Sequence, residues 1–587
     1  MRRSTALRLL ALSLAAALTI TGAYVFLRLT GQGGVTAIDL LRTALVVLTG
    51  FWLIWGSAAA ILGVLTPSRL IQGEPTQAPK GMTAILVPVY NEDPVATFSR
   101  IAAMNRSLVA LGIAERFHFV ILSDTQVMET AALEVVWFNR LIDEPMGAGR
   151  IFYRRRERNV GRKAGNIEDF VARSGGAYDY ALILDADSLM EGATIGEMAR
   201  RMDADPQLGL FQTVPHVINA RTLFGRSLQF AAAYLSPTFA RGAAMMQGNE
   251  GPYWGHNAIV RVRAFAASCG LPELSGKPPF GGHILSHDYV EAALLSRAGW
   301  KVQMDPALPG SFEEGPDNLI EYAKRDRRWC QGNLQHARLV GAPGLKFWSR
   351  FIFLQGIMAY LASPLWLLLL VASMVALVPE QPSVVRGFSK TDISAWTLPI
   401  AVAAILLLPK LAIWLRSILD GRNRSFGGTL AAGGSVVGEI VLSTLLAPTL
   451  LFLQSRAVIQ VLLGIDGGWP ATRRGQNWIS LADAWRASWW IVAIAAATLA
   501  GAVLLASGSA IWVAPAMLPA LLAPVLISWT SRPKRGTATP KLFATDSELA
   551  PSSVIKEQRA IMTAWTIQGS SIEADAASVR TPTHVIA

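Results

Sequence analysis

Two aspartates one residue apart, Asp185 and Asp187, directly follow an apolar run at residues 180–184. The run is short enough for a buried strand, and its polar residues begin where the strand would reach its carboxyl end. Ligands of open parallel sheets bind at that end. Two carboxylates placed there can hold Mg²⁺ or Mn²⁺, and the cation can hold a diphosphate. We therefore predict a metal and nucleotide site, with a pair of solvated loop acids as the alternative.

Two further acids follow apolar runs and could face the same ligand. Glu92 comes after the run at 83–90, and Asp124 comes after the run at 117–123. If both runs are strands of one sheet, the two side chains lie at the same edge as the aspartate pair. Glu92 could then face a nucleotide, and Asp124 could accept a hydrogen bond from the imide of a uracil ring. For both acids, a helix-capping or turn-capping role is the alternative.

A basic loop with glycines, at 154–166, lies between Asp124 and the aspartate pair. Such a loop before a helix can approach a diphosphate closely and neutralise its charge. Lys163 is the residue that we expect to make the direct contact. A run of solvated surface charge is the alternative.

A carboxylate and an Arg-Trp cluster follow later in the chain. Asp288 stands just before an apolar helical stretch and could be a general base or only a helix cap. We expect its neighbour His287 to be structural. Arg325, Arg328 and Trp329 lie in the stretch 324–333, shortly before the third spanning run. Arginine forks suit a diphosphate and a tryptophan face suits a sugar ring, whereas a juxtamembrane basic cluster facing anionic lipid is the alternative.

The composition is that of a membrane protein with a large polar domain. The chain has 587 residues, of which 52% are hydrophobic and only 16% are charged. Its net charge of +12 fits positive loops at a membrane and a cationic cleft for phosphorylated substrates. No basic-aromatic stripe points to nucleic acid. The two cysteines, Cys269 and Cys330, give no disulfide framework, which fits a reducing cytoplasm.

Apolar runs divide the chain into four parts. We expect two transmembrane helices in 1–66, a cytoplasmic domain in 67–345, transmembrane helices in 346–530 and a mobile cytoplasmic tail in 531–587. Within the third part, 436–463 is apolar but contains Pro448 and several polar residues, so we expect an interfacial or re-entrant hairpin. That arrangement keeps the loop 464–487 cytoplasmic.

Strand-like and helix-like segments alternate through the polar domain. Strands are expected at 83–90, 117–123, 150–153, 179–184 and 208–214, with helices at 94–111, 125–142, 162–173 and 193–203. This alternation predicts a doubly wound α/β sheet. The carboxyl edge of that sheet would bring the candidate site residues together.

The order of these motifs between membrane helices resembles that of the processive inverting family 2 glycosyltransferases, which include the cellulose and hyaluronan synthases. The matching pieces are Asp124, the Asp-Ala-Asp at 185–187, the Asp288 motif and the R-x-x-R-W at 325–329. Longer stretches at 253–262, 285–300 and 324–336 are similar to those of bacterial synthases of osmoregulated periplasmic glucans. The resemblance covers about residues 80 to 530.

The resemblance implies a GT-A-like glycosyltransferase domain inserted in a multi-pass helical region of the bacterial inner membrane. It implies transfer of glucose from UDP-glucose to a growing β-1,2-glucan acceptor with inversion, followed by export to the periplasm. The catalytic domain and both termini would be cytoplasmic. It also implies acyl carrier protein and periplasmic glucan-processing proteins as partners, which no residue here indicates.

The resemblance also implies a role for each site residue. Asp124 would contact uridine, Asp185 and Asp187 would hold the diphosphate and Mg²⁺ or Mn²⁺, and Asp288 would be the base. Three residues would line the diphosphate and the acceptor end, and three would face the acceptor: Arg325, Arg328 and Trp329, then Trp254, His256 and Asn257. A β-1,4 polysaccharide synthase, or a nucleotide-binding transporter that makes no glycosidic bond, remains as an alternative.

Overall fold

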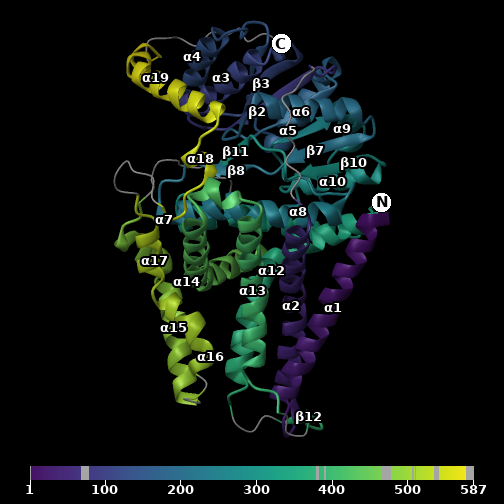
Figure 1. Cartoon of the computed structure of the whole chain (residues 1–587), viewed down its shortest axis with the longest axis vertical. Helices are drawn as coiled ribbons and strands as arrows, with labels where there is room; N and C mark the ends of the chain where they lie inside the picture. Colours follow the sequence, from purple (N-terminus) through teal and green to yellow (C-terminus); the bar gives the residue numbers. More distant parts are fainter. Residues whose placement is uncertain are drawn as a thin grey trace.

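The protein consists of an α/β domain above a bundle of long helices (Figure 1). The computed structural model describes residues 2–67, 78–378, 382–388, 392–465, 478–505, 508, 510–533 and 541–576. Of the predicted cytoplasmic loop 464–487, residues 466–477 fall outside the described residues, and so does the end of the tail at 577–587.

The core of the α/β domain is a seven-stranded sheet, counted over the described residues. Its strand order is β10-β7-β9-β5-β2-β3-β4. The bounds are β2 (Thr83–Val89), β3 (Phe117–Ser123), β4 (Ile151–Arg155), β5 (Tyr180–Ile183), β7 (Leu208–Thr213), β9 (Ala258–Arg261) and β10 (Lys301–Asp305). Strand β9 runs antiparallel to both β5 and β7, so the sheet is mixed. The α/β fold class is confirmed, and β9 and β10 are the two strands of this sheet that the sequence pattern did not indicate.

The register of the central strands fixes where their carboxyl ends lie. Strand β2 pairs in parallel with β3 through Val89 and Ser123, and with β5 through Leu86 and Ile183. The three strands therefore end along one edge of the sheet, as expected for parallel neighbours. The segments that carry Glu92, Asp124 and Asp185 leave the sheet along this edge.

Helices cover both faces of the sheet because its strands are buried on both sides. One face packs against α3 (Pro94–Ala110), α4 (Met128–Ile142) and α6 (Gly192–Ala204). The other face packs against α5 (Arg162–Ser174), α9 (Val262–Ser268) and α10 (His287–Arg297). Short 3-10 turns are η1 (Ala114–Arg116), η2 (Gly175–Ala177) and η4 (His336–Arg338).

A second, three-stranded sheet lies beside the end of β5. Its order is β6-β11-β8, with β6 (Leu189–Met190), β8 (His216–Ile218) and β11 (Ser311–Glu314). Strand β6 begins two residues after Asp187, and β11 pairs with it through Phe312 and Leu189. This pairing brings the acidic end of β11 to the aspartate pair, although the two segments are far apart in the sequence.

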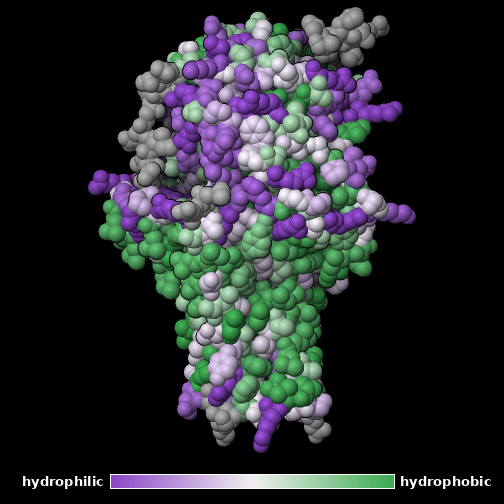
Figure 2. Space-filling view, turned by 90° about the vertical axis from the view of Figure 1, so that its right-hand side faces the viewer, coloured by the Kyte–Doolittle hydropathy of each residue, from purple (hydrophilic) through white to green (hydrophobic). Residues whose placement is uncertain are grey.

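A layer of helices separates the α/β domain from the bundle below it (Figure 1). It contains α7 (Leu223–Phe230), the π-helical turn η3 (Ala231–Leu235), α8 (Ser236–Gln247) and α11 (Leu319–Gln335). Figure 2 shows a hydrophilic surface over the domain and a hydrophobic one over the bundle. This division fits a bundle that lies in a membrane.

Within the described residues, six helices are long and apolar enough to cross a membrane. They are α1 (Arg2–Thr30), α2 (Ala37–Leu65), α12 (Phe347–Val375), α13 (Thr397–Leu419), α14 (Thr429–Leu462) and α15 (Leu481–Leu505). A short ribbon at the far end pairs β1 (Val35–Thr36) with β12 (Ser383–Val385), and η5 (Arg422–Phe426) precedes α14. The chain is therefore a multi-pass membrane protein.

The last apolar run of the predicted transmembrane part 346–530 does not form one straight helix. It forms α16 (Ala510–Leu521) and α17 (Ala523–Thr530), which meet at an angle of 50°. Pro524 lies in the first turn of α17 and has no N–H to continue the hydrogen bonding of α16. The chain therefore bends there, and the pair is one broken span or a re-entrant segment.

The segment 436–463 also differs from the expected hairpin, because no turn divides it. It belongs to one helix, α14, which continues through Pro448. Both ends of α14 nevertheless contact elements of the domain side: Val436 packs with Phe230, and Val461 packs with Leu334. Whether α14 crosses or re-enters the membrane stays a prediction.

The expectation of a mobile tail in 531–587 is wrong for residues 541–567. This segment contains α18 (Asp546–Leu549), and α19 (Ser553–Ala576) packs along α3. Four apolar residues of α19, at helical spacing, are buried in the core of the α/β domain: Val554, Ile555, Ile561 and Trp565. The Ser/Thr/Ala-rich composition concealed this apolar stripe.

We expect Trp565→Ala to lower the stability of the protein by about 3–5 kcal/mol, because a large buried ring is removed. Trp565 is 3% exposed and stacks on Trp137 with 5.0 Å between ring centroids. Thermal unfolding in detergent measures the loss, and Thr566→Ala, an exposed neighbour, is the control. An unchanged melting temperature for Trp565→Ala would contradict the packing of α19.

Candidate active site

A cavity of about 2530 Å³ opens at the carboxyl edge of the central sheet. Eleven of the twelve residues predicted from the sequence line it: Glu92, Asp124, Lys163, Asp185, Asp187, Trp254, His256, Asp288, Arg325, Arg328 and Trp329. They come from strand ends, loops and helices that are far apart in the sequence. The fold therefore brings these residues to one cavity.

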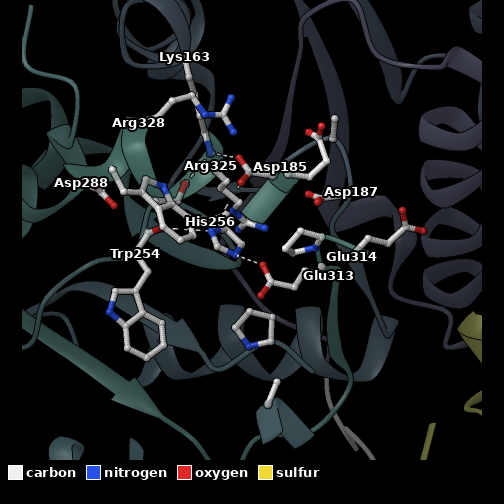
Figure 3. Close-up of a pocket in the computed structure, with 18 of the residues that line it drawn as sticks. Lys163, Asp185, Asp187, Trp254, His256, Asp288, Glu313, Glu314, Arg325 and Arg328 are labelled. Carbon is white, nitrogen blue, oxygen red and sulfur yellow. Dashed lines mark hydrogen bonds and ion pairs between the residues drawn. The ribbon is translucent and has the colours of Figure 1, made fainter. Parts of the chain in front are cut away.

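The Asp185 carboxylate is held by two cationic side chains on the cavity wall (Figure 3). Lys163 forms an ion pair with it and also donates to the Gly255 carbonyl oxygen at 2.7 Å. His256 Nδ1 lies 3.7 Å from the other carboxylate oxygen. Burial alone would raise the pKa of Asp185, but Lys163 and His256 outweigh it and lower that pKa well below its usual range.

Backbone geometry in the basic loop places Lys163 at this carboxylate. Gly161 directly precedes α5 and has φ +69°, a backbone conformation that residues other than glycine rarely adopt. A Cβ on Gly165 would lie 2.3 Å from the Val160 carbonyl oxygen. The two glycines therefore permit a tight turn that starts the helix, and Lys163 extends from this turn to the strand end.

His256 is also bound on its other side, by an acid that the sequence pattern did not indicate. Its Nε2 lies 2.8 Å from a carboxylate oxygen of Glu313, at the end of β11. Burial disfavours the charged ring, but Asp185 and Glu313 outweigh it and raise the pKa of His256 to about 9. His256 is therefore an imidazolium between two carboxylates at neutral pH.

Asp288 lies in the first turn of α10, close to this charged group. A Cβ on Gly255 would be 3.2 Å from Asp288 Oδ2, so the backbone that binds Lys163 also touches Asp288. The helix cap is Ser286 and not Asp288, which removes the capping alternative. Burial raises the pKa of Asp288 to about 6, with His287 opposing and Glu291 adding to the shift.

The Arg-Trp cluster occupies one face of α11 and points into the cavity. Arg328 and Trp329 follow Arg325 by three and four residues, so both lie on the same face of α11 as Arg325. The Arg325 guanidinium lies 4.5 Å from the centroid of the Trp329 ring. Burial, together with Arg325, lowers the pKa of Arg328 from its usual value. This face presents two cationic forks and one aromatic ring to a ligand.

Asp124 and Glu92 are not helix caps. The cap of α3 is Asp93, whose carboxylate accepts from the N–H groups of Val95 and Ala96. Asp124 is buried and forms a bidentate pair with Arg156, at 2.7 and 2.9 Å. The carboxylate oriented by Arg156 remains on the cavity wall.

Asn257 does not face the cavity, contrary to the prediction from the resemblance. It is fully buried, and its amide donates to Ser311 Oγ at 2.8 Å. Its φ of +49° is tolerated by asparagine more readily than by most residues. Asn257 therefore ties the start of β9 to β11, and its neighbours Trp254 and His256 reach the cavity.

The described residues contain no group of three or more His, Cys, Asp or Glu that could hold a metal ion alone. Asp185 and Asp187 supply two carboxylates at the cavity. Mg²⁺ commonly uses one or two protein carboxylates and completes its shell with waters and substrate phosphates. The residues therefore fit a cation that is held jointly with a diphosphate.

Three residues of the site were missed in the sequence: Glu313, Glu314 and Arg100. The two glutamates stand together before Gly315 and Pro316, but no apolar run precedes them as one precedes the aspartate pair. Arg100 gave no signal either, because it lies within the apolar stretch of α3. It pairs with Glu314 at 2.8 Å and donates to the Ala186 carbonyl oxygen at 3.1 Å.

Two family models match this chain. The model described as "Glycosyl transferase family 2" matches residues 84–268, and "Glycosyl transferase family group 2" matches residues 180–414. Among solved structures, a mannosyltransferase from Pyrobaculum calidifontis, in complex with GDP-Man and Mn²⁺, matches 65% of this chain and 99% of its own. Its TM-score is 0.42, with 14% identity.

Curated relatives match nearly the whole chain. The chain is 51% identical over 578 residues to glucans biosynthesis glucosyltransferase H of Cereibacter sphaeroides, covering 96% of each chain. It is 41% identical to the protein of that name from Shewanella oneidensis, covering 90% of this chain and 75% of the relative. The chain is a family 2 glycosyltransferase with a GT-A-like domain, and it belongs to the family of glucans biosynthesis glucosyltransferase H.

Proposed function

We propose that the protein transfers glucose from UDP-glucose to a growing β-1,2-glucan, with inversion, and exports the product to the periplasm. The observation that carries this proposal is the contact at Gly255. Its carbonyl oxygen accepts from Lys163, which pairs with Asp185, and its Cα side lies against Asp288. A candidate base and a candidate diphosphate anchor therefore share one wall of one cavity.

In this mechanism Asp288 takes the proton of the acceptor hydroxyl as that oxygen attacks the anomeric carbon. The Asp288 carboxylate is the right form for this task at neutral pH, since its pKa is about 6. Lys163, Arg325 and Arg328 stabilise the negative charge that develops on the departing UDP. A divalent cation held by Asp185 and Asp187 would neutralise diphosphate charge.

The nucleotide and the acceptor would occupy different ends of the cavity. Glu92 and Asp124 line it at the ends of β2 and β3, where the uridine would bind. Trp254 and Trp329 offer ring faces to the glucan end. The cavity continues to Trp55 of α2. This continuity supports passage of the product toward the membrane helices.

The membrane arrangement supports a cytoplasmic catalytic domain in the bacterial inner membrane. Arg416, Arg422 and Arg424 follow the apolar part of α13 at its domain end, which fits the positive-inside tendency. Figure 1 places both described chain ends on the domain side. Lys410, within α13, pairs with Glu439 of α14 at 2.6 Å, so it is held inside the bundle. Acyl carrier protein and periplasmic processing proteins stay predictions of the resemblance.

Purified protein in lipid vesicles, given UDP-glucose and Mg²⁺, should release UDP and form a β-1,2-linked glucan. Linkage analysis of the product checks this. Asp288→Asn protein, which keeps the shape of the side chain, is the inactive control. A β-1,4-linked product would support glucosyl transfer but contradict the proposed β-1,2 linkage. The absence of any transfer from UDP-glucose would contradict UDP-glucose as the donor.

We expect Asp288→Asn to lower kcat by about 10³, within the usual range for loss of a general base. In the wild type, kcat should fall as the pH drops through about 6, because the base becomes protonated. The residual activity of Asp288→Asn should not show this fall in kcat at acidic pH. Asp143→Asn, an exposed acid at the end of α4, is the control. Wild-type kcat that is flat between pH 5 and 8 would remove Asp288 as the base.

Chelation with EDTA should abolish transfer, and added Mg²⁺ or Mn²⁺ should restore it, because two carboxylates and a diphosphate repel without a cation. Asp187→Asn should raise the Mg²⁺ concentration needed for half-maximal UDP binding, measured by calorimetry. Transfer that continues at full rate in EDTA would eliminate the metal role.

A further inference from the structure

Residues 541–567, here called the C-terminal strap, run from the membrane helices to the α/β domain (Figure 1). At the membrane end, Phe543 is buried against Phe230 and Phe426. Glu548 forms an ion pair with Arg226, which also donates to the Phe543 carbonyl oxygen at 3.1 Å. The strap is thus fixed before it reaches the domain.

The helix α19 of the strap is then fixed along α3. Its apolar face is buried in the domain core. Two polar contacts add to this packing: Glu557 pairs with Arg106 at 2.6 Å, and Gln558 donates to Ser99 Oγ at 3.2 Å. The strap therefore takes a defined position relative to α3. Four residues of the strap line the catalytic cavity: Glu548, Gln558, Arg559 and Met562.

From Arg559 a chain of hydrogen bonds leads to the loop between the two catalytic-site aspartates. Arg559 donates to Asn219 Oδ1 at 3.0 Å, and the Asn219 amide donates to Glu314 Oε1 at 3.1 Å. The same Glu314 oxygen lies 2.8 Å from Arg100, which donates to the Ala186 carbonyl oxygen at 3.1 Å. Each of these hydrogen bonds includes a charged side chain, from Arg559, Glu314 or Arg100, and a charged partner strengthens a hydrogen bond.

The end of this chain is well placed to affect chemistry. Ala186 is the residue between Asp185 and Asp187, so its peptide groups set the direction of both carboxylates. Glu314 is also adjacent to Glu313, which holds His256 against Asp185. A displacement of about 1 Å at such a loop is enough to change a reaction rate strongly.

The chemistry and backbone conformation of Asn219 suit its position between Arg559 and Glu314 in this series of hydrogen bonds. Its φ is +63°, a region that asparagine and glycine tolerate better than other residues. Its side-chain amide supplies the acceptor for Arg559 and the donor for Glu314 at once. Aspartate there would lose the donor, and alanine would also strain the backbone.

We infer that the C-terminal strap is part of the donor site, with Arg559 and Asn219 as positioning residues that hold the Asp185–Asp187 loop through Glu314 and Arg100. The inference rests on the proposed function for its kinetic test, because that test uses UDP-glucose. The strap would act on binding of the metal and diphosphate, without touching the reacting atoms.

The test compares Arg559→Met, Asn219→Gly and the double variant in the full-length protein. Lys556→Met is the matched control, since it removes one exposed positive charge from the same helix outside the cavity. Deleting the strap is unsuitable, because that removes the buried core residues Phe543 and Trp565. Melting temperatures confirm that each variant is folded.

We expect each single variant to raise the Mg²⁺ concentration for half-maximal activity and the KM for UDP-glucose by about threefold to tenfold. The double variant should show no larger increase in these two quantities than Asn219→Gly, because the effects of substitutions within one series of hydrogen bonds are not additive. Hydrogen exchange of the backbone amides at 186–190 should be faster in these variants than in Lys556→Met.

Kinetics and exchange of Arg559→Met that equal those of Lys556→Met would overturn the inference, and so would fully additive effects of the two substitutions. Wild-type protein that transfers nothing from UDP-glucose would instead contradict the proposed function. The exchange experiment needs no substrate, so in that case it decides the inference alone: faster exchange supports it, and unchanged exchange overturns it.

Discussion

The charge on the Asp185 carboxylate is the constraint on which the rest of the site depends. A carboxylate at a cavity wall is stable only when opposite charges and hydrogen bonds replace lost water. Here Lys163 and His256 supply the positive charge, and Glu313 balances the second of them. These four groups are formally neutral together. A diphosphate that entered with a divalent cation would therefore meet, at Asp185, a group of side chains without net charge.

This balance explains why the site needs elements from so many parts of the chain. Asp185 follows β5, Lys163 lies in the first turn of α5, His256 precedes β9 and Glu313 lies in β11. The small sheet β6-β11-β8 holds β11 beside β6, which directly follows the aspartate loop. In the proposed reaction the departing UDP would add negative charge to the cavity, and the cationic face of α11 lines that cavity.

The sequence was most informative where a residue type and a strand end coincide. The strands at 83–90, 117–123 and 208–214 correspond to β2, β3 and β7 because continuous apolar runs mark buried strands. Strand β9 was not predicted, because it lies in the stretch 253–262, in which we looked only for residues that contact a ligand. Arg100 was missed and the role of Asn257 was predicted wrongly for a different reason: both roles depend on tertiary neighbours, which no local spacing encodes.

The tail illustrates a more general limit of composition as a guide. Residues 541–567 contain many small and polar side chains, which favours disorder. Yet four apolar residues on one helical face suffice to bury that face of α19, because α3 and α4 already offer apolar side chains to pack against. Packing against a preformed surface costs less than forming a new core, since only the helix is ordered. A segment of this kind can therefore join the membrane region to the catalytic loop while retaining the composition of a tail.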